Sequence, residues 1–183
     1  QMLGAPFGIV VVDVASGRTR ELTQTVGSWV ARPHFSGDGR WVYFTNRPEK
    51  IGALFRISLE PSAAAERLTD LSRHVHEGLV SPDGRWVAFF AGGKLKKVSV
   101  LGGAAVILCN AALGLGGSWG EDGTIIAGLN QVGGLYRIPA GGGMPAPLTE
   151  PDRERGEVTQ RWPQILPGGK AVLFTAHTRN VGG

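Results

Sequence analysis

Short apolar runs alternate with turns rich in glycine and aspartate along almost the whole chain. The clearest example is Ser81 to Phe89, where Ser-Pro-Asp-Gly-Arg leads into an apolar run. An Asp-Gly pair between two apolar runs is the strongest short-range signal for a β-hairpin, because a tight primed turn needs the positive φ that glycine adopts without steric cost. The pattern therefore predicts a β-hairpin here, with a primed turn at Asp83-Gly84.

The hairpin pattern is repeated along the chain, at Phe35 to Phe44, Trp119 to Ile126 and Ile165 to Phe174. A second marker, a Leu-Thr pair, closes the units, at Leu22-Thr23, Leu68-Thr69 and Leu148-Thr149, and as Leu108-Cys109 in one copy. A spacing of about 40 to 45 residues that holds four short strands is the signature of a β-propeller blade. The repeat therefore predicts one all-β domain over residues 1–183, built from four-stranded antiparallel blades.

Three complete blades are expected, over residues 29–70, 75–109 and 117–149. Residues 7–24 hold only the two outer strands of a blade, and residues 160–176 hold only the two inner strands. Helical alternatives fail, because no segment carries a helical apolar pattern longer than about two turns. Two architectures remain open. The terminal half-blades pair and close a four-bladed ring without sheet edges, or the chain is part of a larger ring.

Composition and charge narrow the function. The 183 residues are 42% hydrophobic and 19% charged, as in an ordered domain, and the net charge of +4 is scattered. Lys94, Lys96 and Lys97 alternate with apolar residues, as on an exposed or edge strand kept soluble by charge. Motifs for nucleic-acid recognition are absent, and no apolar stretch approaches the roughly 18 residues of a membrane span. The sequence therefore predicts neither a nucleic-acid partner nor membrane insertion of this segment.

Candidate catalytic and metal motifs do not fit their surroundings. Gly116 to Gly120 matches G-x-S-x-G, but the nucleophile elbow needs a helix after the serine, and the repeat hairpin follows here. His74 and His76 would point to one face of a strand, yet a metal needs a third and usually a fourth ligand, and none is nearby in sequence. Cys109 replaces a marker threonine and is expected to be a small buried residue. No catalytic residue, metal or cofactor is predicted.

Aligning the copies on their hairpins gives a better candidate. Residues Arg32, Glu77, Gly116 and Trp162 occupy one repeat position, each just before a proline or glycine that enters the innermost strand. In a propeller these strands line the mouth of the central channel, where loops from all blades converge. We therefore predict a ligand-binding site formed by Arg32, His76, Glu77, Arg161 and Trp162. The alternative is that these are ordinary polar groups solvated by water.

With its Ser-Pro-Asp-Gly-Arg hairpin and Leu-Thr ends, the chain resembles the TolB-like family of propeller repeats. Gly156 to Thr175, with Arg161-Trp162-Pro163-Gln164, is also similar to propellers attached to bacterial serine/threonine kinases. TolB-like rings usually have six blades, which needs roughly 260 residues at this period. The resemblance implies a binding module and favours a periplasmic or extracytoplasmic location.

The predicted function is a non-enzymatic scaffold or sensor that binds a protein, peptide or small ligand at the channel mouth. One alternative is an interaction or sensor domain of a larger bacterial kinase or peptidase. A second is a hydrolase with its active site in the channel mouth. Self-assembly is expected if the terminal half-blades do not pair within one chain.

Overall fold

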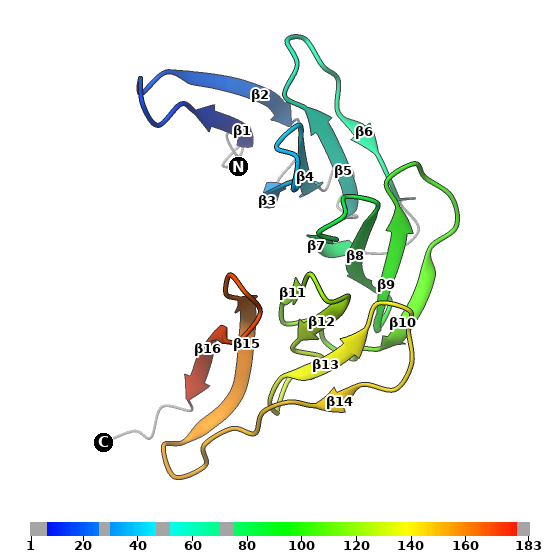
Figure 1. The fold of residues 1–183 in the computed structure, drawn as a ribbon, viewed down its shortest axis with the longest axis vertical. Helices are drawn as coiled ribbons and strands as arrows, with labels where there is room; N and C mark the ends of the chain where they lie inside the picture. Colours follow the sequence, from blue (N-terminus) through cyan, green and yellow to red (C-terminus); the bar gives the residue numbers. More distant parts are fainter. Residues whose placement is uncertain (1–6, 26–29, 47–51, 70–74, 179–183) are drawn as a thin grey trace, which may run out of the picture.

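The computed structural model describes residues 7–25, 30–46, 52–69 and 75–178 (Figure 1). These residues form strands in five antiparallel sheets, and no helix occurs among them. The N-terminal half-blade consists of β1 (Phe7–Val12) and β2 (Thr19–Thr25). The C-terminal half-blade consists of β15 (Glu157–Ile165) and β16 (Val172–Thr178), so that it begins three residues before its predicted start.

Three four-stranded sheets lie between the half-blades. The first blade contains β3 (Val30–Phe35), β4 (Trp41–Asn46), β5 (Ala53–Ser58) and β6 (Glu66–Arg67). The second blade contains β7 (Val75–Val80), β8 (Trp86–Ala91), β9 (Lys94–Ser99) and β10 (Val106–Asn110). The third blade contains β11 (Gly117–Trp119), β12 (Thr124–Ala127), β13 (Tyr136–Pro139) and β14 (Ala146–Pro147). The predicted all-β propeller fold, with three complete blades and two half-blades, is confirmed.

The blades are arranged side by side in an open arc (Figure 1). Strands β3, β7, β11 and β15 lie on its concave side, and the two half-blades lie at opposite ends. Each half-blade forms a separate two-stranded sheet. The closed four-bladed ring that the sequence left open is therefore not the arrangement found here.

The repeat hairpin is closed by a small hydrogen-bond network. In the second blade, Gly84 N donates to Ser81 O (2.9 Å), and the Ser81 hydroxyl donates to Asp83 Oδ1 (2.6 Å) while accepting a hydrogen bond from Trp86 N (2.9 Å). Of the residues in this turn, Ser81 to Trp86, only Gly84 has a positive φ (68°). A type I′ turn would need positive φ at both central residues. The hairpin is thus confirmed, but its predicted primed turn is wrong: the aspartate and serine build a longer loop that ends in a left-handed glycine.

The Leu-Thr marker ties the outermost strand of a blade to its neighbour. In the first blade, Leu68 N donates to Leu54 O (2.8 Å), and Leu54 N donates back to the Thr69 hydroxyl (3.0 Å). The third blade repeats this exchange with Leu135 and Thr149. Cys109, which stands at the threonine position of the second blade, is buried as expected, and its burial raises the pKa of the thiol.

The hydrophobic core lies between the blades rather than in one centre. Ile9 of the N-terminal half-blade packs with residues of the first blade such as Val42 and Phe44. Two further clusters join the first blade to the second and the second to the third. Because the first and second blades are covered on both faces in this way, their second strands, β4 and β8, are buried on both sides.

The lysine cluster does not occupy an edge strand. Strand β9 pairs with β8 on one side and β10 on the other, and its lysines are half-buried. Lys97 Nζ lies over the Trp86 ring, 4.4 Å from its centroid, and donates to Ala140 O in the third blade (2.7 Å). Lys97 therefore links the second blade to the third, and Lys94 Nζ donates to Asn110 Oδ1 of β10 (2.8 Å). No helix among the described residues is long and apolar enough to cross a membrane.

Candidate functional site

The innermost strands carry an irregularity at the repeat position singled out from sequence. The strand register shifts between Ala31 and His34 in β3, between His76 and Gly78 in β7, and between Arg161 and Gln164 in β15. Each shift is a β-bulge, which bends the strand and changes the direction of a side chain. The bulges lie on the concave side of the arc (Figure 1).

Two of the bulges, in β7 and β15, contain a residue in the left-handed conformation. Glu77 has φ of 55° and Trp162 has φ of 50°, and Gly116 at the same repeat position has φ of 92°. Such values are uncommon for residues with a Cβ, and non-glycine residues held there cluster at functional sites. The chain therefore places a carboxylate and an indole at positions where glycine would fit with less strain.

Small residues after the bulges let the blades approach each other. A Cβ added to Gly78 would lie 2.8 Å from Leu54 Cδ1, and one added to Gly117 would lie 2.7 Å from Leu79 Cδ1. Contacts that short require the neighbour to move. The glycines that follow the bulges are thus required by leucines of the preceding blade.

The last bulge is joined directly to the third blade. Trp162 N donates to Leu115 O (2.8 Å), and a Cβ on Gly116 would lie only 2.7 Å from Trp162 Cα. The backbone of Trp162 is thereby fixed on the third blade. Trp162 nevertheless remains 46% exposed.

A cavity of about 740 Å³ opens at the bulges, with lining residues on all four innermost strands. It is lined by, among others, Pro33, His34, Glu77, Ser118, Trp119, Trp162 and Gln164. Its size falls in the range of about 300 to 1,000 Å³ that is typical of ligand pockets. The lining combines a carboxylate, an imidazole, two indoles and an amide, so it offers both stacking surfaces and polar groups.

The cavity contains two of the predicted site residues, Glu77 and Trp162. Arg161 does not line it; its side chain is half-buried, and its Nε has no hydrogen-bond partner among the described residues. Arg32 and His76 lie on β3 and β7, but their side chains are outside the described part of the structure, as is the whole of His74.

Other lining residues were missed at the sequence level, although a signal was present. His34, Leu79, Ser118 and Gln164 all stand two residues after the bulge position, and all four line the cavity. Residues two apart on a strand point to one face. Comparing the copies at the position two residues after the bulge would therefore have identified these four side chains from the sequence.

Ser118 has a structural role in this arrangement. It lies on β11, paired with Ile126, and its hydroxyl accepts a hydrogen bond from Ile165 N of the C-terminal half-blade (3.1 Å). The strand-turn-helix context of a nucleophile elbow does not occur in the described residues around it. The described residues also contain no group of three His, Cys, Asp or Glu side chains placed to hold a metal ion.

Several solved structures share the fold at low sequence identity. A putative TolB from Agrobacterium tumefaciens matches with a TM-score of 0.75 and 22% identity, over 94% of this chain and 63% of that one. TolB from Acinetobacter baumannii matches with a TM-score of 0.66 and 21% identity, over 82% and 39%. A chain of the nidogen/laminin complex matches with a TM-score of 0.73 and 10% identity, over 91% and 65%.

No protein-family model and no curated protein sequence matches the chain. The structural likeness shows the fold: the chain consists of β-propeller blades like those of TolB. It spans less than two thirds of the length of either TolB chain.

Proposed function

We propose that this chain is a non-enzymatic binding module that holds a protein or peptide segment in the cavity at the bulges. The observation that carries the proposal is the placement of Glu77 and Trp162, two strained residues at one repeat position, in the same cavity. Strain retained in a rigid scaffold is typical of sites where a side chain must be aimed at a ligand. The packed sheets supply that rigidity.

The lining favours a polypeptide ligand. Tryptophan gives a large contact area at low entropic cost and is the commonest type of binding hot spot, together with tyrosine and arginine. Trp119 and Trp162 lie on adjacent strands of two different blades, and Pro33 and Pro163 add further apolar surface. Glu77 would accept hydrogen bonds from a peptide amide or a cationic side chain. Among the structural neighbours, the nidogen/laminin complex is an example of a propeller in a protein complex.

The finer assignment, as the interaction or sensor domain of a larger bacterial kinase or peptidase, uses the same cavity. It differs from the binding module only in what is attached to the propeller. Determining which domains the full reading frame encodes beside this propeller would distinguish the two assignments.

The binding function can be tested with a phage-displayed library of random peptides selected on the purified chain. Enriched peptides are then measured by calorimetry. We expect Trp162→Ala to weaken their binding about 30-fold, as for a hot-spot tryptophan worth about 2 kcal/mol. Met144→Ala, which changes an exposed apolar residue that does not line the cavity, is the control and should leave binding unchanged. Enriched peptides that bind both variants equally, or no enrichment, would count against the proposal.

A hydrolase is the second candidate, because Ser118, His34 and Glu77 line one cavity. A nucleophile, a base and an acid are the groups that acyl transfer requires. We expect no ester hydrolysis above the buffer rate, since the described residues around Ser118 lack the strand-turn-helix arrangement of a nucleophile elbow. Turnover of p-nitrophenyl acetate that disappears in Ser118→Ala, with the fold intact by circular dichroism, would establish the enzyme instead.

A further inference from the structure

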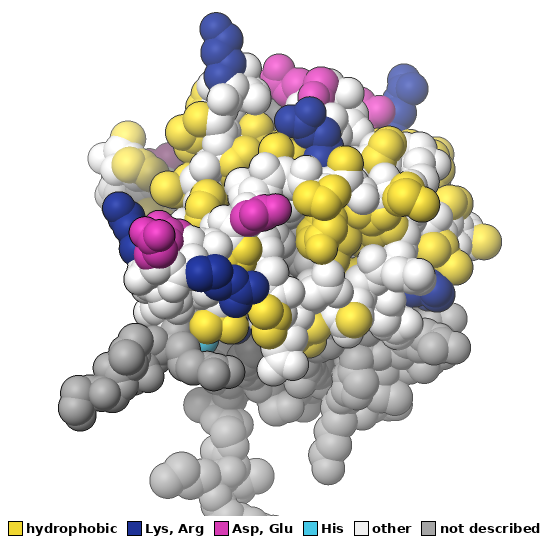
Figure 2. Space-filling model, turned by 90° about the horizontal axis from the view of Figure 1, so that it is seen from below, with side chains coloured by type: hydrophobic (Ala, Val, Ile, Leu, Met, Phe, Trp, Pro, Cys, Tyr) yellow, Lys and Arg dark blue, Asp and Glu magenta, His cyan; other side chains and the backbone are white. Residues whose placement is uncertain are grey.

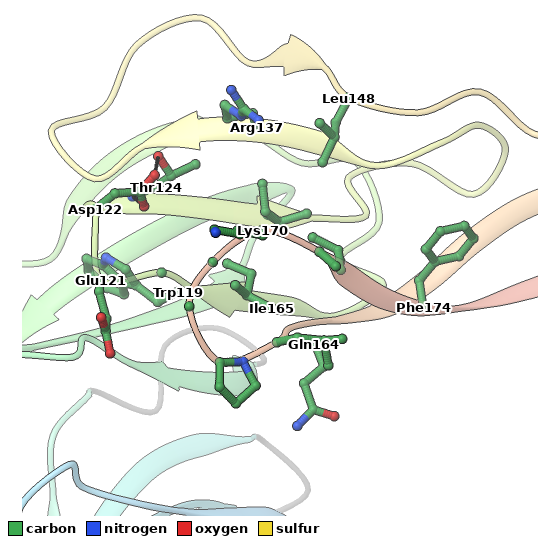
Figure 3. A pocket seen from close by; sticks show the side chains of 18 of the residues that line it. Trp119, Glu121, Asp122, Thr124, Arg137, Leu148, Gln164, Ile165, Lys170 and Phe174 are labelled. Carbon is green, nitrogen blue, oxygen red and sulfur yellow. Dashed lines mark hydrogen bonds between the residues drawn. The ribbon is translucent and has the colours of Figure 1, made fainter.

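The cavity at the bulges differs from the other large cavity in its charge. Among its described lining residues, Glu77 is the only Asp, Glu, Lys or Arg, and its side chain is half-buried. The other cavity, of about 900 Å³, lies between the third blade and the C-terminal half-blade (Figure 3). Its lining carries charges of both signs, from Glu121, Asp122, Arg137 and Lys170. A single negative charge therefore characterises the cavity at the bulges.

The two indoles of the cavity at the bulges favour the same ligand charge as the carboxylate does. Trp119 is half-buried and Trp162 is 46% exposed. The face of an aromatic ring is negative and attracts a cation within about 6 Å of the ring centre, and tryptophan does so most strongly. A carboxylate has lone pairs for about four hydrogen bonds, so Glu77 can accept from a ligand in addition to its neighbours in the chain. Both kinds of group thus favour a positively charged ligand.

Anionic and apolar ligands fit this lining less well. An anionic side chain would lie beside the Glu77 carboxylate and would meet no Lys or Arg among the lining residues that the structure describes. Two like charges brought together out of water repel each other. An apolar segment would take the carboxylate further out of water without offering it a hydrogen-bond donor, which costs free energy. A ligand group that carries both a positive charge and several donors avoids both costs.

The first blade shows how an indole and a carboxylate bind one cation together. The guanidinium carbon of Arg56 lies 4.2 Å from the centre of the Trp41 ring. The same guanidinium donates from Nε to Glu66 Oε2 (2.8 Å), and its Nη2 lies 2.7 Å from that oxygen. A guanidinium is planar, so its face stacks on the indole while its edge donates to the carboxylate. The cavity at the bulges contains an indole and a carboxylate, and its ligand would supply the guanidinium.

We propose, on the basis of the binding function proposed above, that the bound polypeptide inserts an arginine side chain into this cavity. Its guanidinium stacks on the Trp162 indole and donates hydrogen bonds to the Glu77 carboxylate. Both residues stand at one repeat position, and Gly116, which holds that position just before β11, has no side chain to separate them. Strand β11 lies between β7 and β15 (Figure 1). Lysine fits less well, because its ammonium group is a compact, strongly hydrated charge without a flat face.

Long-range electrostatics do not favour a basic partner. The chain has a net charge of +4, and Figure 2 shows Lys and Arg side chains interspersed with Asp and Glu on the face that it views. A large field of one sign, which would steer a charged partner from a distance, is not present on that face. Selectivity for arginine therefore has to come from short-range contacts in the cavity, which salt screens much less than it screens exposed charges.

The test uses the peptides enriched from the random library as probes. Each arginine of an enriched peptide is replaced in turn by citrulline, which is planar but uncharged, and by lysine. At one position we expect citrulline to weaken binding about 10- to 100-fold, because the charge-assisted hydrogen bonds to Glu77 are lost. Lysine keeps the charge but loses the stacking face, so we expect a smaller loss, of about 5-fold. Calorimetry measures the dissociation constants.

The matching change in the protein is Glu77→Gln, which removes the carboxylate charge and keeps the size of the side chain. We expect the arginine peptide to bind this variant about 10- to 100-fold more weakly. The citrulline peptide should bind both proteins with the same affinity, which also shows that the variant is folded. Glu60→Gln is the control: it removes the same charge from an exposed residue that does not line the cavity, and should leave both affinities unchanged.

The outcomes separate this inference from the binding function on which it rests. Peptides that need Trp162 but contain no arginine, or that bind Glu77→Gln as tightly as the unchanged chain, would overturn the arginine inference and leave the binding function in place. The same holds if citrulline replaces every arginine without loss. Enriched peptides that bind Trp162→Ala as tightly as the unchanged chain, or the absence of any enrichment, would contradict both proposals.

Discussion

Two interfaces of the same repeat differ in how they are filled. Between the first and second blades, Leu54 of β5 packs with Val87 and Val98 of the next blade, and all three are fully buried. Between the third blade and the C-terminal half-blade, the corresponding space is a cavity of about 900 Å³. The comparison shows that a blade's outer strands, as well as its inner ones, build the core shared with its neighbour. Stability should therefore be concentrated in the complete blades and lower at the half-blade.

The largest expected effect is at the filled interface. Leu54→Ala removes a fully buried side chain and should lower the free energy of unfolding by about 2 to 5 kcal/mol, from lost burial and the cavity left behind. Leu101→Ala makes the same chemical change at a side chain that is 90% exposed and should change it by less than about 0.5 kcal/mol. Urea denaturation of both variants measures the difference. Equal losses of unfolding free energy in the two variants would contradict the conclusion that the filled interface carries the stability.

The close approach at the same interface gives the next effect. Gly78→Ala places a Cβ 2.8 Å from Leu54 Cδ1, and the expected loss of stability is about 1 to 3 kcal/mol. Gly141→Ala is the matched control, because its Cβ would meet nothing within 4 Å and its φ is not positive. We expect it to be neutral or slightly stabilising. A tolerated Gly78→Ala would mean that the blades can move apart without cost.

A smaller effect isolates the strain at the bulge of a complete blade. Glu77→Gly and Glu77→Ala both remove the carboxylate, so the difference between them reports the backbone alone. With φ of 55°, we expect the glycine variant to be the more stable by about 1 kcal/mol. At Glu150, whose φ is not positive, the glycine variant should show no such advantage. If alanine were the better residue at both positions, the bulge would not be strained.

The sequence predicted the blades well, because the evidence for them is local. The Asp-Gly hairpins and Leu-Thr ends set strand limits within a few residues, and their hydrogen bonds link residues of one blade. The relation between the half-blades could not be obtained in this way. It depends on the angle between neighbouring blades, which is set by side chains far apart in sequence such as Leu54 and Val87.

The repeat also identified part of the candidate site, because equivalent positions of the blades can be aligned from the sequence. Glu77 and Trp162 were found because they share a repeat position, and both line the cavity. Arg161 was predicted together with its neighbour Trp162, but only Trp162 lines the cavity. A bulge cannot be located from an alternating pattern, since it is the point at which the alternation fails.

The smallest expected effect compares the hairpins of the two regions. Asp38 and Asp83, in the first and second blades, have lowered pKa values, mainly because Ser36 and Ser81 donate hydrogen bonds to their carboxylates. A lowered pKa in the folded state means that the carboxylate stabilises the hairpin above the unfolded pKa of about 3.9, and that this is lost as pH falls through the folded value. The hairpin of the C-terminal half-blade, with Gly168 at this position, has no such carboxylate.

Amide hydrogen exchange at pH 7 and at pH 2.5 can resolve this difference between hairpins. After correction for the intrinsic pH dependence of exchange, we expect protection to fall at Trp86, whose amide donates to the Ser81 hydroxyl, and not at Leu166. Ser81→Ala should raise the pKa of Asp83 toward its ordinary value, because the donor that lowers this pKa is gone. The pH dependence of protection at the Trp86 amide should then disappear. If the half-blade hairpin responded to pH as strongly as the second-blade hairpin, the acid effect would have to arise in the blade interfaces rather than in the turns.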